Sequence, residues 1–384
     1  MVKEWIENNL RGDKMIWFIV AVLSVFSLLA VYSSTGTLAY KYQSGNTEYY
    51  FLKHFFLLAL GLVIMFFAHK ITYTAYSKVA RVGLFVVIPM LLFTLLGGTN
   101  LNDASRWLTL PVVGLTFQTS DFAKLALILF VARALSRKQD DIANFKEAFL
   151  PIIVPVVVVC GLIFPANFST AAILFTTCLF LMFIGRVRAG FIFGLLGIGV
   201  VALALFLGIA KLVNYEGRIS TWTNRIENFR NGDSEDNYQA EQAKIAIAKG
   251  GVMGLGPGNS ETRNFLPHPY SDSIFPIIAE EYGLIGPFIV LLMYILLFYR
   301  AVVMVRKSPK AFATLLAFGC SFSLVFQAMI NMAVATNIFP VTGQPLPLVS
   351  MGGTSMWFTS LSIGILLSVS HAIQKEGGEK VATV

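Results

Sequence analysis

Ten long apolar stretches dominate the sequence and decide what the chain can fold into. Crossing about 30 Å of hydrocarbon takes about 20 residues of α-helix. Lipid offers the backbone no hydrogen-bonding partner, so such stretches are expected to be helices. We therefore predict an all-α, polytopic membrane protein with about ten transmembrane helices in a single domain, residues 1–384. The stretches lie at residues 15–34, 51–68, 79–97, 120–135, 148–164, 168–184, 189–212, 274–299, 311–337 and 354–373.

Composition excludes the common alternatives to a membrane fold. Hydrophobic residues make up 56% of the chain and charged residues 13%, whereas soluble domains carry about 25% charged residues. A soluble globule, a disordered chain and a disulfide-stapled secreted domain are therefore excluded. The cysteines Cys160, Cys178 and Cys320 lie inside apolar stretches without metal-binding spacing, which predicts small core residues.

The net charge of +8 is unevenly distributed between the two sides of the predicted bundle. If both termini are cytoplasmic, the inner segments carry 18 of the 29 Lys and Arg residues. The short outer loops then carry only Lys41, Lys53 and Arg106. This asymmetry follows the positive-inside rule. The charge therefore indicates a multi-pass protein with cytoplasmic termini, and no nucleic-acid partner is expected.

Residues 213–273, between the seventh and eighth stretches, form an outer loop far longer than a connector requires. Loops of this length are usually functional or disordered, and anchors such as Tyr215 and Trp222 argue against disorder. Residues 238–249 are expected to form a short helix, followed by a glycine-rich turn at 250–259. The turn lacks the spacing and the Lys-Ser/Thr of a Walker motif, so no nucleotide site is predicted.

Two ionisable residues open the fourth apolar stretch. Asp121 and Lys124 are three residues apart and share one helix face. An ionisable residue at membrane depth costs at least about 2.5–3.5 kcal/mol on insertion scales and so indicates function. Two interpretations follow: a self-neutralising ion pair, or a cavity in which Lys124 binds a phosphate-bearing ligand.

Arginines on the outer side are further candidates for binding an anion. Arg106 is the only Arg of the short outer loops, and its planar guanidinium suits a diphosphate. A snorkelling Arg beside the interfacial Trp107 is the alternative. Arg218 and Arg225 flank Trp222 and share a face if the segment is helical. They fit an interfacial amphipathic helix as well as they fit a substrate clamp.

Asp272 stands where the long outer loop meets the eighth stretch. One explanation is a helix cap, which Ser271 or Asp272 would provide. The other is chemistry, because a carboxylate at the lipid–water boundary can reach a hydroxyl of a lipid-linked headgroup. Glu280 and Glu281 lie about 12–14 Å deeper along a helix and are too distant to form an acid–base pair with Asp272.

Five motifs follow one another between residues 105 and 355. They are SRWL at 105–108, QTSDFAK at 118–124, GLGPGNS at 254–260, LPHPYSDSIF at 266–275 with EEYG at 280–283, and PVTGQPLPLVSMGGTS at 340–355. They resemble, in order, "xRWI", "QPSE-x-x-K", "GxGLGNS", "LPEAHTDFIFA…GEELG" and "P-x-x-G-x-x-LPxxSxGGSS" of the SEDS family. These are the FtsW and RodA proteins of bacterial shape, elongation, division and sporulation. One motif is weak evidence, whereas the ordered set is specific.

Some positions depart from the family pattern. The family's "QPDLGT" reads PANFST here, so Asn167 stands in place of a carboxylate. In "E-A-H-T-D", His268 replaces the glutamate and Tyr270 replaces the histidine, whereas Asp272 is retained. The PANFST segment resembles FtsW more than RodA, which favours a role in division.

The resemblance implies a glycan-strand polymerase that uses lipid II at the outer face of the bacterial inner (cytoplasmic) membrane. Its implied partners are a class B penicillin-binding protein and membrane proteins of the divisome or elongasome. A sugar hydroxyl attacks an anomeric carbon whose leaving group is a lipid diphosphate, which requires a base and cations. Asp272 is expected to be that base, or a ligand of Mg²⁺ or Mn²⁺. The implied substrate-binding residues are Arg106, Lys124, Arg218, Arg225, Gln118 and Ser350.

Two other functions fit ten spans and charges at membrane depth. One is a flippase for lipid II, although the paired broken helices common in transporters are not evident in the sequence. The other is a non-enzymatic scaffold for the penicillin-binding protein. Asp272 distinguishes the three functions, because only the enzyme requires a carboxylate there.

Overall fold

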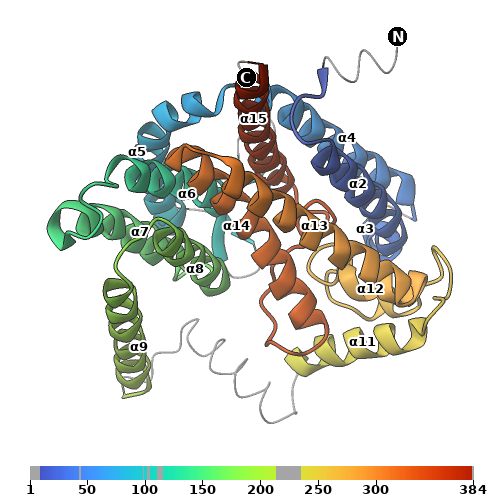
Figure 1. Cartoon of the computed structure of the whole chain (residues 1–384). Helices are drawn as coiled ribbons and strands as arrows, with labels where there is room; N and C mark the ends of the chain where they lie inside the picture. The colour runs from blue at the N-terminus through green and yellow to red at the C-terminus, as the bar shows by residue number, and fades with distance from the viewer. Residues whose placement is uncertain are drawn as a thin grey trace.

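Figure 1 shows the computed structural model, a helical bundle in which residues 9–42, 45–97, 99–101, 104–109, 116–212 and 235–382 are described. The first half contains α2 (Lys14–Ser34), α3 (Gly36–Tyr42), α4 (Thr47–Ala68), α5 (Tyr73–Gly97), α6 (Thr119–Arg137), the π-helix η1 (Phe145–Phe149) and α7 (Leu150–Ile163). The second half contains α8 (Phe168–Ile184), α9 (Ala189–Leu212), α11 (Glu235–Gly250), the 3-10 helix η2 (Thr262–Asn264), α12 (Ile274–Tyr282), α13 (Ile285–Lys307), α14 (Ala311–Ala335) and α15 (Thr354–Ala382).

Helices cover most of each of the ten predicted stretches, and residues 274–299 are divided between two of them. Within the described residues, seven helical segments are long and apolar enough to cross a membrane: α2, α4, α5, η1 with α7, α13, α14 and α15. The remaining stretches lie in α6, α8 and α9; α6 carries four charged residues, and α8 has only 17 residues. The helices therefore support a multi-pass membrane protein, while the count of ten spans stays a prediction.

The prediction of one continuous helix over 274–299 is wrong, because the helix breaks at Gly283. Gly283 has φ 60° and ψ −156°, a conformation open essentially to glycine alone. The carbonyls that end α12 do not continue the helix. Instead, the N–H groups of Leu255 and Gly256 donate to the carbonyl oxygens of Glu280 and Glu281, at 3.0 and 2.9 Å. The glycine-rich turn is thus a backbone cap for α12.

The turn approaches α12 so closely that Gly254→Ala is expected to destabilise the protein. A Cβ on Gly254 would lie 2.2 Å from the carbonyl oxygen of Glu281, at a φ of +79°. Gly→Ala at an incompatible φ costs more than about 1 kcal/mol. Gly258→Ala, at φ +82° with nothing within 4 Å, isolates the conformational cost. Thermal melting in detergent should rank Gly254→Ala well below Gly258→Ala, and equal melting points would contradict the close approach.

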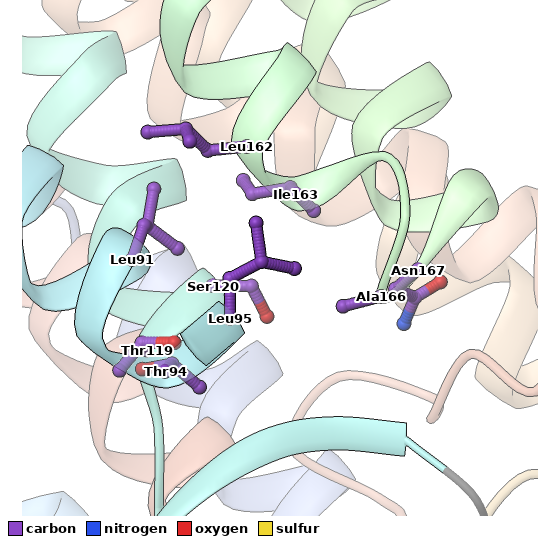
Figure 2. Close-up of a pocket in the computed structure, with 9 residues that line it drawn as sticks. All are labelled: Leu91, Thr94, Leu95, Thr119, Ser120, Leu162, Ile163, Ala166 and Asn167. Carbon is purple, nitrogen blue, oxygen red and sulfur yellow. The ribbon is translucent and has the colours of Figure 1, made fainter. Parts of the chain in front are cut away.

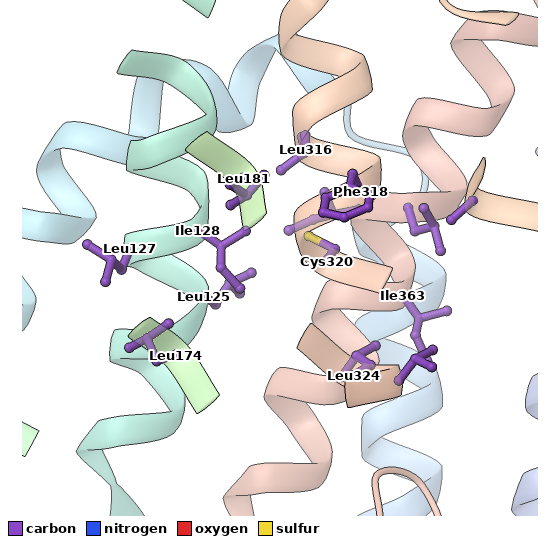
Figure 3. Packing of buried hydrophobic residues seen from close by; sticks show 14 of the residues in the cluster. Leu125, Leu127, Ile128, Leu174, Leu181, Leu316, Phe318, Cys320, Leu324 and Ile363 are labelled. Carbon is purple, nitrogen blue, oxygen red and sulfur yellow. The ribbon is translucent and has the colours of Figure 1, made fainter. Parts of the chain in front are cut away.

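The core of the bundle is built around α6 and α14. Figure 3 shows side chains of these helices packing with those of α8 and α15, among them Leu125, Leu181 and Leu324. Leu181 is fully buried, and a Cβ on Gly319 of α14 would lie 3.1 Å from one of its methyl groups. The predicted core role of the three cysteines is confirmed, because all three are free and buried.

The two ends of the described chain lie at the same end of the bundle (Figure 1). The carbonyl oxygen of Asn9 lies 2.9 Å from Nε2 of His69, and Arg300 forms an ion pair with Asp13. A Cβ on Gly12 would lie 2.7 Å from the carbonyl oxygen of Leu367 in α15. The predicted even number of membrane crossings would place both ends of the chain on the same side, as found here.

A small antiparallel sheet supplements the predicted all-α fold. Strands β1 (Thr99–Leu101), β2 (Ala104–Thr109) and β3 (Thr116–Gln118) lie in that order, and Trp107 of β2 pairs with Gln118 of β3. The sheet therefore stands at the N-terminal end of α6, where two candidate motifs meet.

Part of the long predicted loop, 213–273, is described. Helix α11 spans Glu235–Gly250 and confirms the helix predicted over 238–249. Arg218 and Arg225 lie outside the described residues, so their predicted roles stay predictions.

Candidate functional site

Asp272 lies at the entrance to α12, and its side chain is partly exposed. The N-cap position of α12 is Ser273, so the cap explanation, which named Ser271 or Asp272, is wrong. The side-chain amide of Asn331 in α14 donates to the backbone carbonyl of Asp272 at 2.9 Å. A Cβ placed on Gly343 would lie 3.7 Å from Oδ2 of Asp272. The carboxylate therefore faces the chain that joins α14 to α15.

That chain, residues 340–351, is called the return segment below. The hydroxyl of Ser350 accepts from the N–H of Leu346 at 2.8 Å and donates to the carbonyl of Ser271. The N–H of Met351 donates to the carbonyl of Tyr270 at 2.9 Å. Ser350 is only 3% exposed, so it supports the residue before Asp272 and is poorly placed to contact a substrate itself.

Lys124 forms the cationic part of the site. Its Nζ lies 2.8 Å from Oδ1 of Asp121 and donates to Oε1 of Gln327 at 3.1 Å. The side chains of Lys124 and Asp121 are 15% and 3% exposed. The second oxygen of Asp121, Oδ2, is buried and has no hydrogen-bond partner among the described residues. The predicted ion pair is therefore present, and Oδ2 of Asp121 can accept a further hydrogen bond.

The same ion pair borders a small cavity between α6, α14 and α15, of about 20 Å³ and partly open to the outside, which is room for about one water molecule. Its polar lining comes from Asp121, Lys124, Ser323, Gln327, Ser355, Thr359 and Ser362. A charged group beside hydroxyls and an amide can hydrogen-bond an anion or a sugar, although the cavity in this structure is too small to hold such a ligand. Both interpretations of Lys124, structural pair and cavity wall, are thus compatible with this geometry.

One helix face of α14 connects Lys124 to Asp272. Gln327 receives the hydrogen bond from Lys124 and donates through Nε2 to the carbonyl of Pro345 at 2.8 Å. Asn331 donates both to Asp272 and to the carbonyl of Gln344, the latter at 2.7 Å. These amides are four residues apart, or about 6 Å along the helix. Lys124, the candidate cation, and Asp272, the candidate base, are therefore hydrogen-bonded to residues on consecutive turns of α14.

Gln118 and Arg106 lie at the N-terminal end of α6. Gln118 occupies the N-cap position, and its side-chain amide donates to the hydroxyl of Ser120 at 2.9 Å. Its backbone N–H donates to the hydroxyl of Thr354 at 3.2 Å. Arg106 precedes Trp107, the strand partner of Gln118. The backbone thus brings Arg106 to the helix that carries Lys124, and its predicted contact with a diphosphate stays a prediction.

Asn167 caps α8 and also lines a second cavity. Its Oδ1 accepts from the N–H of Thr170 at 3.2 Å. Gln344 of the return segment donates to the hydroxyl of Thr170 at 2.9 Å. Figure 2 shows Asn167 across the cavity from Thr119 and Ser120 at the start of α6. An amide performs this capping without a charge, which explains how the position can dispense with the family's carboxylate.

Glu280 and Glu281 have a structural role that the sequence did not reveal. Both are buried. Glu280 accepts from the hydroxyl and N–H of Thr262 at 2.8 and 3.3 Å and from the hydroxyl of Ser260. Glu281 accepts from the hydroxyl of Ser33 in α2. These carboxylates therefore attach residues 260–262 and α2 to the end of α12.

A divalent ion would find few protein ligands here. The described residues contain no group of three or more His, Cys, Asp or Glu side chains that could hold a metal. Mg²⁺ is often bound by only one or two carboxylates, with substrate phosphates completing its coordination. Asp272 as a single carboxylate ligand fits that mode and does not fit a permanent metal cage.

Comparison with known proteins gives one family across nearly the whole chain. The model of the cell cycle protein family FTSW_RODA_SPOVE matches residues 13–375. Stage V sporulation protein E of Bacillus subtilis is 30% identical over 374 residues, covering 94% of this chain and 97% of that protein. The probable peptidoglycan glycosyltransferase FtsW of Trichlorobacter lovleyi is 31% identical over 370 residues, covering 94% of each chain. The protein of the same name from Haemophilus influenzae is 31% identical.

Solved structures share the fold. A chain of a peptidoglycan synthase complex superposes with a TM-score of 0.73 at 24% identity, covering 94% of this chain and 97% of that one. The rod shape determining protein RodA of Thermus thermophilus superposes with a TM-score of 0.68 at 23% identity, covering 94% and 98%. At these identities the likeness establishes the helical architecture alone.

Proposed function

This chain belongs to the cell cycle protein family of FtsW, RodA and SpoVE, and we propose that it polymerises glycan strands of peptidoglycan from lipid II. Relatives named as peptidoglycan glycosyltransferases, more than 30% identical over nearly their full length, support this enzyme class. The observation that carries the proposal is the attachment of Asp272 and Lys124 to consecutive turns of α14. A base and a diphosphate-binding cation are the two services that this transfer requires.

In the proposed reaction, Asp272 accepts the proton of the attacking sugar hydroxyl. The hydroxyl oxygen bonds to the anomeric carbon of the second lipid II as the bond from that carbon to the diphosphate breaks. Lys124, with Arg106, Arg218 and Arg225 as further candidates, stabilises the charge that develops on the diphosphate. The diphosphate is a good leaving group without a strong acid, so one carboxylate is sufficient and the paired carboxylates of glycosidases are unnecessary.

A divalent cation, Mg²⁺ or Mn²⁺, would add Lewis-acid stabilisation of the diphosphate. Asp272 would then be its protein ligand. Lys124 and the amides of α14 would still orient the substrate. Ser350 would act by holding the backbone next to Asp272, and Gln118 would order the outer end of α6.

We further propose a cellular setting. The protein would lie in the bacterial inner membrane, and relatives named FtsW favour a role in division. A class B penicillin-binding protein would cross-link its product, within the divisome or, in the alternative, the elongasome.

Cysteine labelling is expected to place the long loop outside and the termini inside. Met253 is 81% exposed in the glycine-rich turn, and the three native cysteines are buried. An impermeant maleimide should therefore label Met253→Cys in intact spheroplasts, while wild type stays unlabelled. Labelling of this variant only after lysis would reverse the topology and remove the site from the side where lipid II is used.

The enzyme, flippase and scaffold functions are distinguished in detergent micelles, which have no second leaflet. Purified protein is mixed with fluorescent lipid II and Mg²⁺ or Mn²⁺, with and without the penicillin-binding protein. We expect a ladder of glycan strands that a muramidase digests. No strands in either mixture, combined with lipid II transport in vesicles, would favour the flippase. No strands and no transport would favour the scaffold.

A further inference from the structure

Leu348 in the return segment has a backbone conformation that leucine avoids. Its φ is +63°, and the residue is 3% exposed. In the left-handed region the Cβ of an L-residue crowds the following carbonyl oxygen, which favours glycine or asparagine there. Such a conformation persists only where the surrounding structure enforces it, and it is concentrated at functional sites. The contacts that enforce it here can be identified.

Two buried hydroxyls hold the carbonyls on either side of Leu348. The hydroxyl of Tyr294 in α13 donates to the carbonyl of Pro347. The hydroxyl of Ser27 in α2 donates to the carbonyl of Val349 at 2.9 Å. Since these donors come from different helices, the peptide group before Leu348 and the peptide group after Val349 are anchored independently. A change in the backbone conformation of Leu348 would have to be compensated at Val349, or it would break one of these bonds.

His54 of α4 supports Ser27. Its Nε2 lies 2.7 Å from the Ser27 hydroxyl oxygen. Because that hydroxyl gives its proton to Val349, the imidazole must donate from Nε2. Ser27 and His54 are both 0% exposed, and Tyr294 is 1% exposed. Water is therefore a poor substitute for either donor.

Leu348 lies just before the residues that contact the Asp272 junction. Ser350 bonds to the carbonyl of Ser271, and Met351 bonds to the carbonyl of Tyr270. We infer that Ser27, supported by His54, and Tyr294 are positioning residues that hold Leu348 in its left-handed conformation and so fix Asp272 for glycosyl transfer. The inference rests on the proposed polymerase function, and it assigns these residues no contact with substrate.

The test compares Ser27→Ala and Tyr294→Phe, which remove only the hydroxyls, with wild type. Displacement of a reacting group by about 1 Å can cost about 100-fold in rate. We therefore expect kcat for lipid II polymerisation to fall by about 10- to 100-fold at an unchanged KM. Ser27→Thr keeps a hydroxyl and should recover most of the rate. The double variant should lose less than the product of the two single losses, because both bonds hold one segment.

Ser368→Ala is the matched control. Ser368 is a buried serine of α15 whose hydroxyl donates to the carbonyl of Ile71, at the end of the bundle near the termini. It should lower the melting temperature as Ser27→Ala does and leave kcat unchanged. Equal kcat in Ser27→Ala, Tyr294→Phe and wild type, or equal losses in Ser27→Ala and Ser368→Ala, would overturn the inference.

Hydrogen exchange of backbone amides tests the same positioning role and does not depend on enzymatic activity. Amides of the return segment should exchange faster in Ser27→Ala than in wild type and Ser368→Ala. Unchanged exchange would refute the positioning role even if wild type proved inactive. Faster exchange in Ser27→Ala, combined with a wild type that makes no glycan, would instead reject the proposed function. It would still support the role of Ser27 in holding the return segment.

Discussion

Replacing Lys124 by methionine is expected to weaken lipid II binding by about 10- to 100-fold and to destabilise the fold. A hydrogen bond to a charged group contributes about 1.5–3 kcal/mol, which corresponds to that range of affinity. Lys124 also neutralises Asp121, whose side chain is 3% exposed. Breaking a buried ion pair by removing one partner costs about 3–5 kcal/mol. A loss of function in Lys124→Met alone would therefore be ambiguous.

The double variant Asp121→Asn/Lys124→Gln separates the two effects. It leaves no uncompensated charge, so the melting temperature should return towards the wild-type value. It also lacks the cation, so lipid II binding, measured by fluorescence polarisation in detergent, should remain weak. Wild-type affinity in the double variant would mean that the ion pair is purely structural.

Lys249→Met is the control for Lys124→Met, because Lys249 forms an ion pair of the same length on the surface. Nζ of Lys249 lies 2.8 Å from Glu261, with both side chains well exposed. Exposed pairs contribute little to stability. Neither the melting temperature nor lipid II binding should change measurably in this variant.

Much of the bundle was predictable because apolar length alone forces a helix in lipid. The ion pair of Asp121 and Lys124 was predictable from their spacing on one helix face. The break at Gly283 was not, since the apolar stretch continues through it. The cause is a set of backbone bonds from the glycine-rich turn, almost thirty residues earlier.

The amides that join the two parts of the site were missed, although a signal was present. Gln327 and Asn331 are polar residues four apart within an apolar helix, and polar residues at membrane depth indicate function. The support from Ser27 and Ser350 had no comparable signal. Their partners are backbone carbonyls, Val349 and Ser271, and which carbonyl a serine contacts depends on the packing of distant helices.

Asp272→Asn is expected to reduce glycan polymerisation by about 100-fold or more, the usual contribution of a general base. Asparagine retains the size of the side chain. The hydrogen bond from Asn331 goes to the backbone carbonyl, so the substitution leaves it in place. The variant should therefore fold, reach the membrane and bind the proposed penicillin-binding partner, and its loss should appear in the rate rather than in lipid II affinity.

The decisive measurement is the rate of glycan-strand formation by purified Asp272→Asn and wild type at saturating fluorescent lipid II. It is made in detergent with Mg²⁺ or Mn²⁺ and with the penicillin-binding protein present in both reactions. We predict matched lipid II binding and melting temperatures, with strands from wild type and essentially none from the variant. Polymerisation by Asp272→Asn at a rate near that of wild type would contradict a carboxylate-dependent glycosyltransferase mechanism.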